Sequence, residues 1–110
     1  MKTRSKPTYR LDGVKQAVAS RRYRLKSRPA NFIKNHCERQ PSEVVQTVFR
    51  AMKDTDFRKS IELQMMPGTM ADVYLVECDG DAWYVKFYMD ADSACPVCVV
   101  LSCNFDGFIH

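Results

Sequence analysis

The stretch ADVYLVECDGDAWYVKFYM at residues 71–89 contains two runs rich in β-branched and aromatic residues, separated by Asp79-Gly80. Runs of this composition, bounded by turn residues, are typical of β-strands. Aspartate and glycine both tolerate the positive φ angles of a tight hairpin turn. The sequence therefore predicts a β-hairpin with strands near 71–78 and 82–89.

The second strand of this hairpin also shows which face is buried. Side chains alternate between the two faces of a strand. One set of alternating positions is large and apolar, which predicts the core face: Trp83, Val85, Phe87 and Met89. The opposite face carries Tyr84, Lys86 and Tyr88.

The segments that flank the hairpin predict further strands near 57–66 and 97–103 and three helices before them. Apolar residues recur at helical spacing in three segments, near 11–20, 29–39 and 41–52. The third has the clearest stripe, formed by Val44, Val45, Val48, Phe49 and Met52. Helices followed by strands predict an α+β fold, with N-terminal helices packed on an antiparallel sheet.

We expect residues 1–110 to form a single domain, because a chain of this length can build one core but not two. Residues 1–8 are predicted to be a mobile basic arm, and the charged residues 21–28 an irregular connection. No apolar run approaches the roughly 20 residues that span a bilayer, and no apolar signal core follows the basic start. The expected location is the cytoplasm, without membrane contact.

The charge is distributed unevenly. Residues 1–60 contain 16 Lys and Arg against five Asp and Glu, whereas residues 61–110 contain one lysine against eight acidic residues. A basic surface attracts nucleic acid because phosphate neutralisation releases condensed counterions. The competing interpretation is that the basic and acidic halves face each other, or that the charges coat solvated helix faces.

The five cysteines leave three interpretations open. Cys95-Pro-Val-Cys98, followed by Cys103 and His110, provides four candidate ligands for zinc. Alternatively, Cys95 and Cys98 form a redox C-x-x-C motif, or the thiols are simply buried. We favour buried thiols, because a strand over 97–103 places Cys98 and Cys103 on opposite faces and so predicts no metal site.

Three motifs resemble the motility quorum-sensing regulator family of toxins. They are the opening KPTYRLDGVKQAV at 6–18, the block TDFRKS at 55–60, and DVY at 72–74 followed by YVK at 84–86. The resemblance covers roughly residues 4–104. It implies a RelE-like fold with a curved antiparallel sheet, and a type II toxin that is a metal-independent endoribonuclease without a cofactor. It also implies messenger RNA as substrate and a cognate antitoxin, usually zinc-bearing and DNA-binding, as partner.

The resemblance assigns the catalytic positions residue by residue. The family lysine and tyrosine correspond to Lys59 and Tyr84, which are therefore the predicted catalytic residues. A family glutamine corresponds to Ala71, and the family's terminal lysine corresponds to Asn104, so both of those groups are lost. Five basic residues are predicted to bind RNA phosphates: Arg58, Lys86, Arg21, Arg22 and Arg24.

The chemistry favours lysine over histidine at this site. His36 falls on an apolar helix face and His110 is the last residue, so neither is placed to act as part of an acid and base pair. A lysine stabilises an anionic transition state, and positive neighbours or burial lower its pKa. The alternative hypothesis is a toxin-like module that has lost catalysis and acts by binding protein or nucleic acid, because Ala71 and Asn104 cannot act chemically.

Overall fold

The predicted hairpin lies at the centre of the fold. The computed structural model describes residues 2–91 and 94–107. Strands β4 (Met70–Cys78) and β5 (Asp81–Asp90) pair antiparallel, with Cys78 opposite Asp81. Asp79 and Gly80 have φ angles of 53° and 85°, as a tight turn with two left-handed residues requires.

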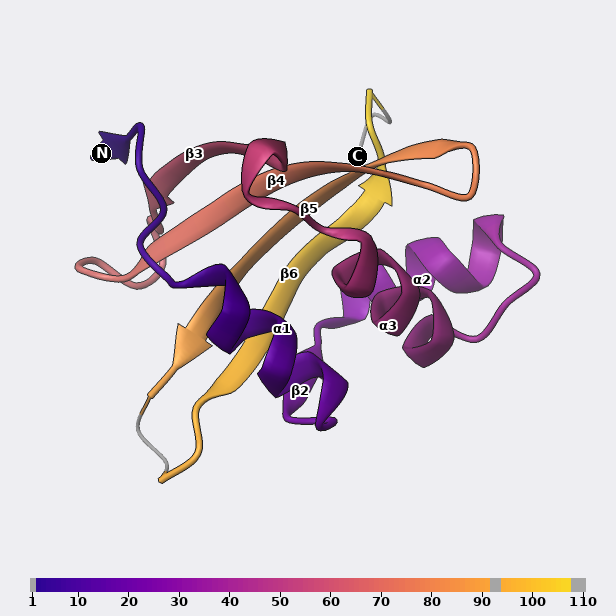
Figure 1. Ribbon diagram of the computed structural model, residues 1–110, viewed down its shortest axis with the longest axis horizontal. Helices are drawn as coiled ribbons and strands as arrows, with labels where there is room; N and C mark the ends of the chain where they lie inside the picture. Colours follow the sequence, from indigo (N-terminus) through magenta and orange to yellow (C-terminus); the bar gives the residue numbers. More distant parts are fainter. Residues whose placement is uncertain (1, 92–93, 108–110) are drawn as a thin grey trace.

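Four further strands extend the hairpin into a six-stranded sheet (Figure 1). The order across the sheet is β1-β3-β4-β5-β6-β2. All neighbours are antiparallel except β2, which runs parallel to β6. The additional strands are β1 (Thr3–Arg4), β2 (Tyr23–Leu25), β3 (Phe57–Glu62) and β6 (Val97–Phe105).

Three helices cover one face of this sheet, which confirms the predicted α+β class (Figure 1). They are α1 (Leu11–Ala19), α2 (Ser27–His36) and α3 (Pro41–Ala51), and a 3₁₀ turn, η1 (Asp54–Asp56), precedes β3. The apolar stripe of α3 packs against the predicted core face of β5, where Val85 and Phe87 are fully buried. We call the opposite side of the sheet, on which no described helix packs, the open face.

Several predicted boundaries differ from the structure. The segment predicted to be irregular, 21–28, contains β2 and the first turn of α2, because β2 finds a parallel partner in β6 that local periodicity does not reveal. The predicted strand 57–66 ends at Glu62, and the next residues form a turn with Met65 exposed. The short strand β1 was not predicted either.

A β-bulge in β6 corrects the prediction made for its cysteines. Lys86 is opposite Ser102 whereas Phe87 is opposite Val100, so β6 carries one extra residue, Leu101. The extra residue reverses the alternation, and Cys98 and Cys103 both lie in the core on the helix side. The prediction that they occupy opposite faces was wrong, because a bulge cannot be recognised from alternation alone.

The DVY motif fastens the N-terminal segment to the sheet. The buried Asp72 carboxylate accepts hydrogen bonds from the backbone N–H groups of Thr8 (3.0 and 3.1 Å) and Tyr9 (3.0 Å). The Thr8 and Ser60 hydroxyls are hydrogen-bonded at 2.7 Å. Tyr74, two residues further on, stacks on Phe87 in the core. Both polar residues of the motif therefore act on the helix side of the sheet.

Candidate RNA-cleavage site

The open face brings two of the predicted site residues into one row across the strands. Residues that pair between neighbouring strands point to the same side of a sheet. Lys59 of β3 pairs with Val73 of β4, Val73 pairs with Lys86 of β5, and Lys86 pairs with Ser102 of β6. We call this set, Lys59, Val73, Lys86 and Ser102, the lysine row. Lys86 is the only Lys or Arg after residue 59, and it lies in the middle of the sheet.

Tyr84 lies in the adjacent row on the same face. It is flanked by Leu75 on β4 and Asn104 on β6. Because Tyr84 and Lys86 are two residues apart on one strand, the phenol and the ammonium extend from the same surface. The structure thus places Lys59, Tyr84 and Lys86 together, from segments that are up to 27 residues apart in the sequence.

The floor beneath these side chains is apolar. Ala71 and Val73 also belong to the open face, yet they are 0% and 1% exposed. Long amphipathic side chains cover such a surface with their stems and keep their polar ends in solvent. Charges above an apolar floor interact more strongly than they do in bulk water.

This environment changes the acidity of the site residues. Partial burial lowers the pKa of Lys86, and the positive charges of Arg28 and Lys59 lower it further. Burial raises the pKa of the Tyr84 phenol. Tyr84 is consequently protonated near neutral pH and can donate a hydrogen bond or a proton.

Arg28 lies close enough to Lys86 to lower its pKa, a neighbour that the sequence did not predict. Arg28 is exposed in the first turn of α2. Its proximity depends on β2 pairing with β6, since that pairing brings the start of α2 to the sheet edge. No motif marked Arg28, and it was one of ten basic residues between Lys2 and Arg28.

Arg58 lies beside the row but is folded back on its own turn. Its Nη1 donates to the carbonyl oxygens of Thr55, Asp56 and Phe57 at 3.2–3.4 Å. The register of β3 shifts between Phe57 and Lys59, so Arg58 occupies a bulge. Its guanidinium is exposed and its hydrogen bonds hold the turn that precedes Lys59.

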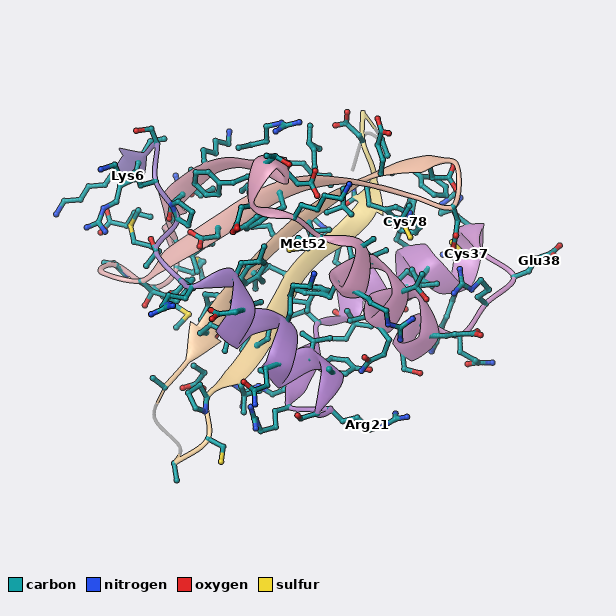
Figure 2. The ribbon with its side chains drawn as sticks, viewed as in Figure 1. Lys6, Arg21, Cys37, Glu38, Met52 and Cys78 are labelled. Carbon is teal, nitrogen blue, oxygen red and sulfur yellow. The ribbon has the colours of Figure 1, made fainter. Side chains whose placement is uncertain are left out.

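The three arginines near the end of α1 do not form one surface. Arg24 shares the open face with Val99 and pairs with Asp90, Nη2 to Oδ2 at 2.7 Å. Arg21 has a left-handed φ of 65°, and Figure 2 shows its side chain extending away from the sheet. Arg22 is half-buried against α1, and its Nε is buried without a hydrogen-bond partner among the described residues. Only Arg24 therefore faces the same side as Lys86.

The cysteines and histidines lie away from this site. Burial raises the pKa of Cys98 strongly and that of Cys103 to about 12, so both thiols stay protonated near neutral pH. Cys37 and Cys78 border a cavity of about 240 Å³. Figure 2 shows the two side chains between the end of α2 and the β4–β5 turn. Within residues 2–91 and 94–107, no three His, Cys, Asp or Glu side chains are grouped to hold a metal ion. His36 is exposed and stacks on Phe32, and His110 lies outside the described residues.

Comparison with known proteins identifies the family of this chain. Residues 6–102 match the family described as motility quorum-sensing regulator, toxin of MqsA. The chain belongs to this toxin family. It is accordingly a toxin of a toxin–antitoxin system, with an antitoxin as its cognate partner. A search of curated proteins found none that matches the chain.

Two positions at which this family member lacks an expected catalytic group, Ala71 and Asn104, lie within the same surface. Asn104 is opposite Tyr84, is 4% exposed, and its amide nitrogen donates to the Phe105 carbonyl at 3.1 Å. Ala71 is fully buried and pairs with Ile61, in the row that adjoins the lysine row on the side away from Tyr84.

In the part of the chain that the structure describes, no helix is long and apolar enough to cross a membrane.

Proposed function

We propose that this toxin is a metal-independent endoribonuclease that cleaves messenger RNA on the open face of its sheet. The observation that supports the proposal is the convergence of Lys59, Lys86 and Tyr84 on one surface above an apolar floor. Preorganised cations and hydrogen-bond donors in such a site stabilise a developing anion without reorganising solvent. The proposed roles of Lys59 and Tyr84 are catalytic.

The reaction that fits these groups is an internal transfer at one phosphodiester. The 2′-hydroxyl loses its proton to solvent and its oxygen forms a bond to phosphorus. The bond from phosphorus to the 5′-oxygen breaks, and Tyr84 donates its proton to that oxygen. Lys59 and Lys86 stabilise the additional negative charge on the phosphorane, with Arg58 and Arg24 holding flanking phosphates. The products are a 2′,3′-cyclic phosphate and a 5′-hydroxyl end.

The cellular setting follows from the substrate. Messenger RNA that is being translated is in the cytoplasm, which is where we propose that the toxin acts. We further propose that the cognate antitoxin binds zinc and DNA, as the family resemblance implies. The RelE-like assignment rests on the same resemblance and on a sheet of six mostly antiparallel strands with helices on one face.

The decisive test is cleavage of a labelled RNA by the purified toxin in excess chelator, with both ends of the products identified. We expect 5′-hydroxyl and 2′,3′-cyclic phosphate ends. The matched control is Lys59→Ala prepared in the same way, because a contaminating nuclease would cleave the RNA equally in both preparations. Loss of one such electrostatic contact lowers the rate by about 100- to 1000-fold. Cleavage that requires a divalent metal, or that survives in Lys59→Ala, would contradict the proposal.

A binding module without catalysis is the second candidate, and Ala71 and Asn104 favour it. Neither side chain can carry charge or exchange a proton, and the Asn104 amide already donates to a backbone carbonyl. This alternative predicts RNA or antitoxin binding that depends on Lys59 and Lys86, with no cleavage by the wild type. If the RNA stays intact in the same assay while the wild type still binds it, the binding module is supported.

A further inference from the structure

The sheet edge next to the lysine row is formed by the start of α2 instead of a strand. β2 pairs with β6 only as far as Leu25 opposite Val100, and the Lys26 N–H donates to the Val100 carbonyl at 3.2 Å. Helix α2 begins at the next residue, Ser27, and packs on β6 (Figure 1). The first turn of α2 therefore lies where β2 would have continued, beside the bulged Leu101 and Ser102.

Arg28 is in this turn, at the open end of the lysine row. Pro29, the next residue, is buried, whereas Arg28 is exposed. Within the described residues Arg28 forms no ion pair, in contrast to Arg24, which pairs with Asp90 at the same edge. Its charge acts on Lys86 across Ser102, since it is one cause of the lowered pKa of that lysine.

We propose that Arg28 is the third phosphate-binding cation of the row and that single-stranded RNA crosses the strands from Lys59, over Lys86, to Arg28. The inference rests on the proposed function, because it names how the substrate of that same site is held. The four residues of the lysine row include no acidic side chain, so the path between the cations carries no repelling charge. A neighbouring row supplies the half-buried Tyr84, on which a base can stack.

The spacing of the cations sets the length of RNA that is bound. Neighbouring strands are about 4.8 Å apart, so Lys59 and Lys86, two strands apart, have backbones separated by roughly 10 Å. Arg28 lies at a similar distance beyond Lys86, which gives a row about 20 Å long. Stacked nucleotides rise about 3.4 Å each, so the row accommodates at most about six nucleotides. Phosphates bound by Lys86 and by Arg28 are then at most about three nucleotides apart.

The test uses a fluorescent 2′-O-methyl RNA of about ten nucleotides, which binds but cannot be cleaved, in a salt titration with the full-length toxin. Each phosphate contact with a single strand contributes about 0.7 to the slope of log affinity against log salt. We expect Arg28→Ala to lower the slope by about that amount and the affinity by roughly ten-fold. Arg28→Lys retains the charge and should retain the slope.

Arg50→Ala is the matched control. Arg50 is an exposed arginine on α3, on the helix-covered side of the sheet, and its removal changes the net charge by the same amount. We expect it to leave the slope unchanged. Replacing one phosphate at a time by an uncharged methylphosphonate then locates the contact. One position should weaken wild-type binding and have no effect in Arg28→Ala.

The outcomes separate this inference from the proposed function. If the wild type cleaves RNA while Arg28→Ala and Arg50→Ala have the same slope as wild type, the role of Arg28 is refuted and the nuclease stands. If the wild type binds RNA with a slope that depends on Arg28 but does not cleave it, the proposed RNA path is supported and the proposed nuclease activity is refuted. If the wild type binds no RNA at any salt concentration, both are overturned.

Discussion

The two faces of the central strands use the same backbone for different purposes. On β5, Phe87 is fully buried among the helices, and its neighbour Lys86 projects from the opposite face over an apolar floor. On the helix side, the buried Asp72 carboxylate accepts hydrogen bonds from the backbone N–H groups of Thr8 and Tyr9. The open face instead carries two lysines, Lys59 and Lys86, in one row that contains no acidic residue. Alternate residues of a single strand thus contribute to the core and to the proposed substrate surface.

The largest expected effect is a difference in the free energy of unfolding between substitutions of two adjacent residues. Phe87→Ala removes a buried aromatic ring from the core and should lower the free energy of unfolding by about 3–5 kcal/mol. Lys86→Ala should change it by less than about 1 kcal/mol, because the side chain is only half-buried and its charge is repelled by Arg28 and Lys59. Urea unfolding measures both.

Cleavage assays complete this comparison. Lys86→Ala should remain folded but lose cleavage by roughly 100-fold, since it removes a contact to the developing negative charge. A folded Lys86→Ala with wild-type activity would show that the open face has no part in the reaction. A loss of stability in Lys86→Ala as large as that in Phe87→Ala would show that the two faces are not functionally distinct.

Smaller effects on stability and cleavage rate are expected from replacing two tyrosines, one on each face of the sheet. The Tyr74 hydroxyl is buried without a hydrogen-bond partner among the described residues, and burial raises its pKa to about 12. Tyr74→Phe should therefore raise the free energy of unfolding by about 1 kcal/mol, because a desolvated and unpaired hydroxyl is removed. Tyr84→Phe should leave stability nearly unchanged and slow cleavage by about 100-fold, as loss of a general acid does.

Thermal unfolding and single-turnover cleavage of both variants test the contrast. If Tyr84→Phe keeps the wild-type rate, then the phenol is not the proton donor and its ring only contacts the RNA. If Tyr74→Phe is instead destabilised by more than 1 kcal/mol, the hydroxyl has a partner, such as an internal water. In either case the other variant is the control for general effects of removing a phenol.

The contrast between the faces explains which features could be predicted from the sequence. The hairpin at Asp79-Gly80 and the stripe of α3 were predictable, because turn chemistry and periodicity are local. The common face of Tyr84 and Lys86 followed from a local strand pattern, and Lys59 was selected by the resemblance to known motifs. Arg28 could not be found in this way, since its position depends on the parallel pairing of β2 with β6, whose paired residues are 75 positions apart in the sequence.

The same reasoning accounts for the error at the cysteines and for a difference among the arginines that the sequence did not reveal. Alternation predicted opposite faces for Cys98 and Cys103, but the single extra residue at Leu101 reversed the pattern between them. Arg21, Arg22 and Arg24 appeared equivalent as a basic cluster, although the turn after α1 and the start of β2 direct them to different environments. Charge composition indicates that a basic surface exists, whereas strand register decides which basic residues share it.

The smallest expected effect is a pH dependence that arises only on the open face. The pKa of Lys86 is lowered by burial and by its cationic neighbours, so its ammonium loses its proton at a lower pH than the ordinary 10.5. In the window between the lowered pKa and the ordinary value, the folded chain binds fewer protons at Lys86 than the unfolded chain does. The contribution of Lys86 to the stability of the fold therefore increases with pH in this window.

RNA binding should change in the opposite direction, because only the charged ammonium attracts phosphate. As the pH rises toward the ordinary pKa of lysine, we expect the affinity for 2′-O-methyl RNA to fall a few-fold in the wild type, because Lys86 loses its charge at a lower pH than an ordinary lysine does. Lys86→Arg should remove this decline, since a guanidinium stays charged throughout the range. Arg28→Ala should move the decline to higher pH, because one cause of the lowered pKa is absent. Parallel pH profiles for all three proteins would mean that Lys86 does not contact the RNA.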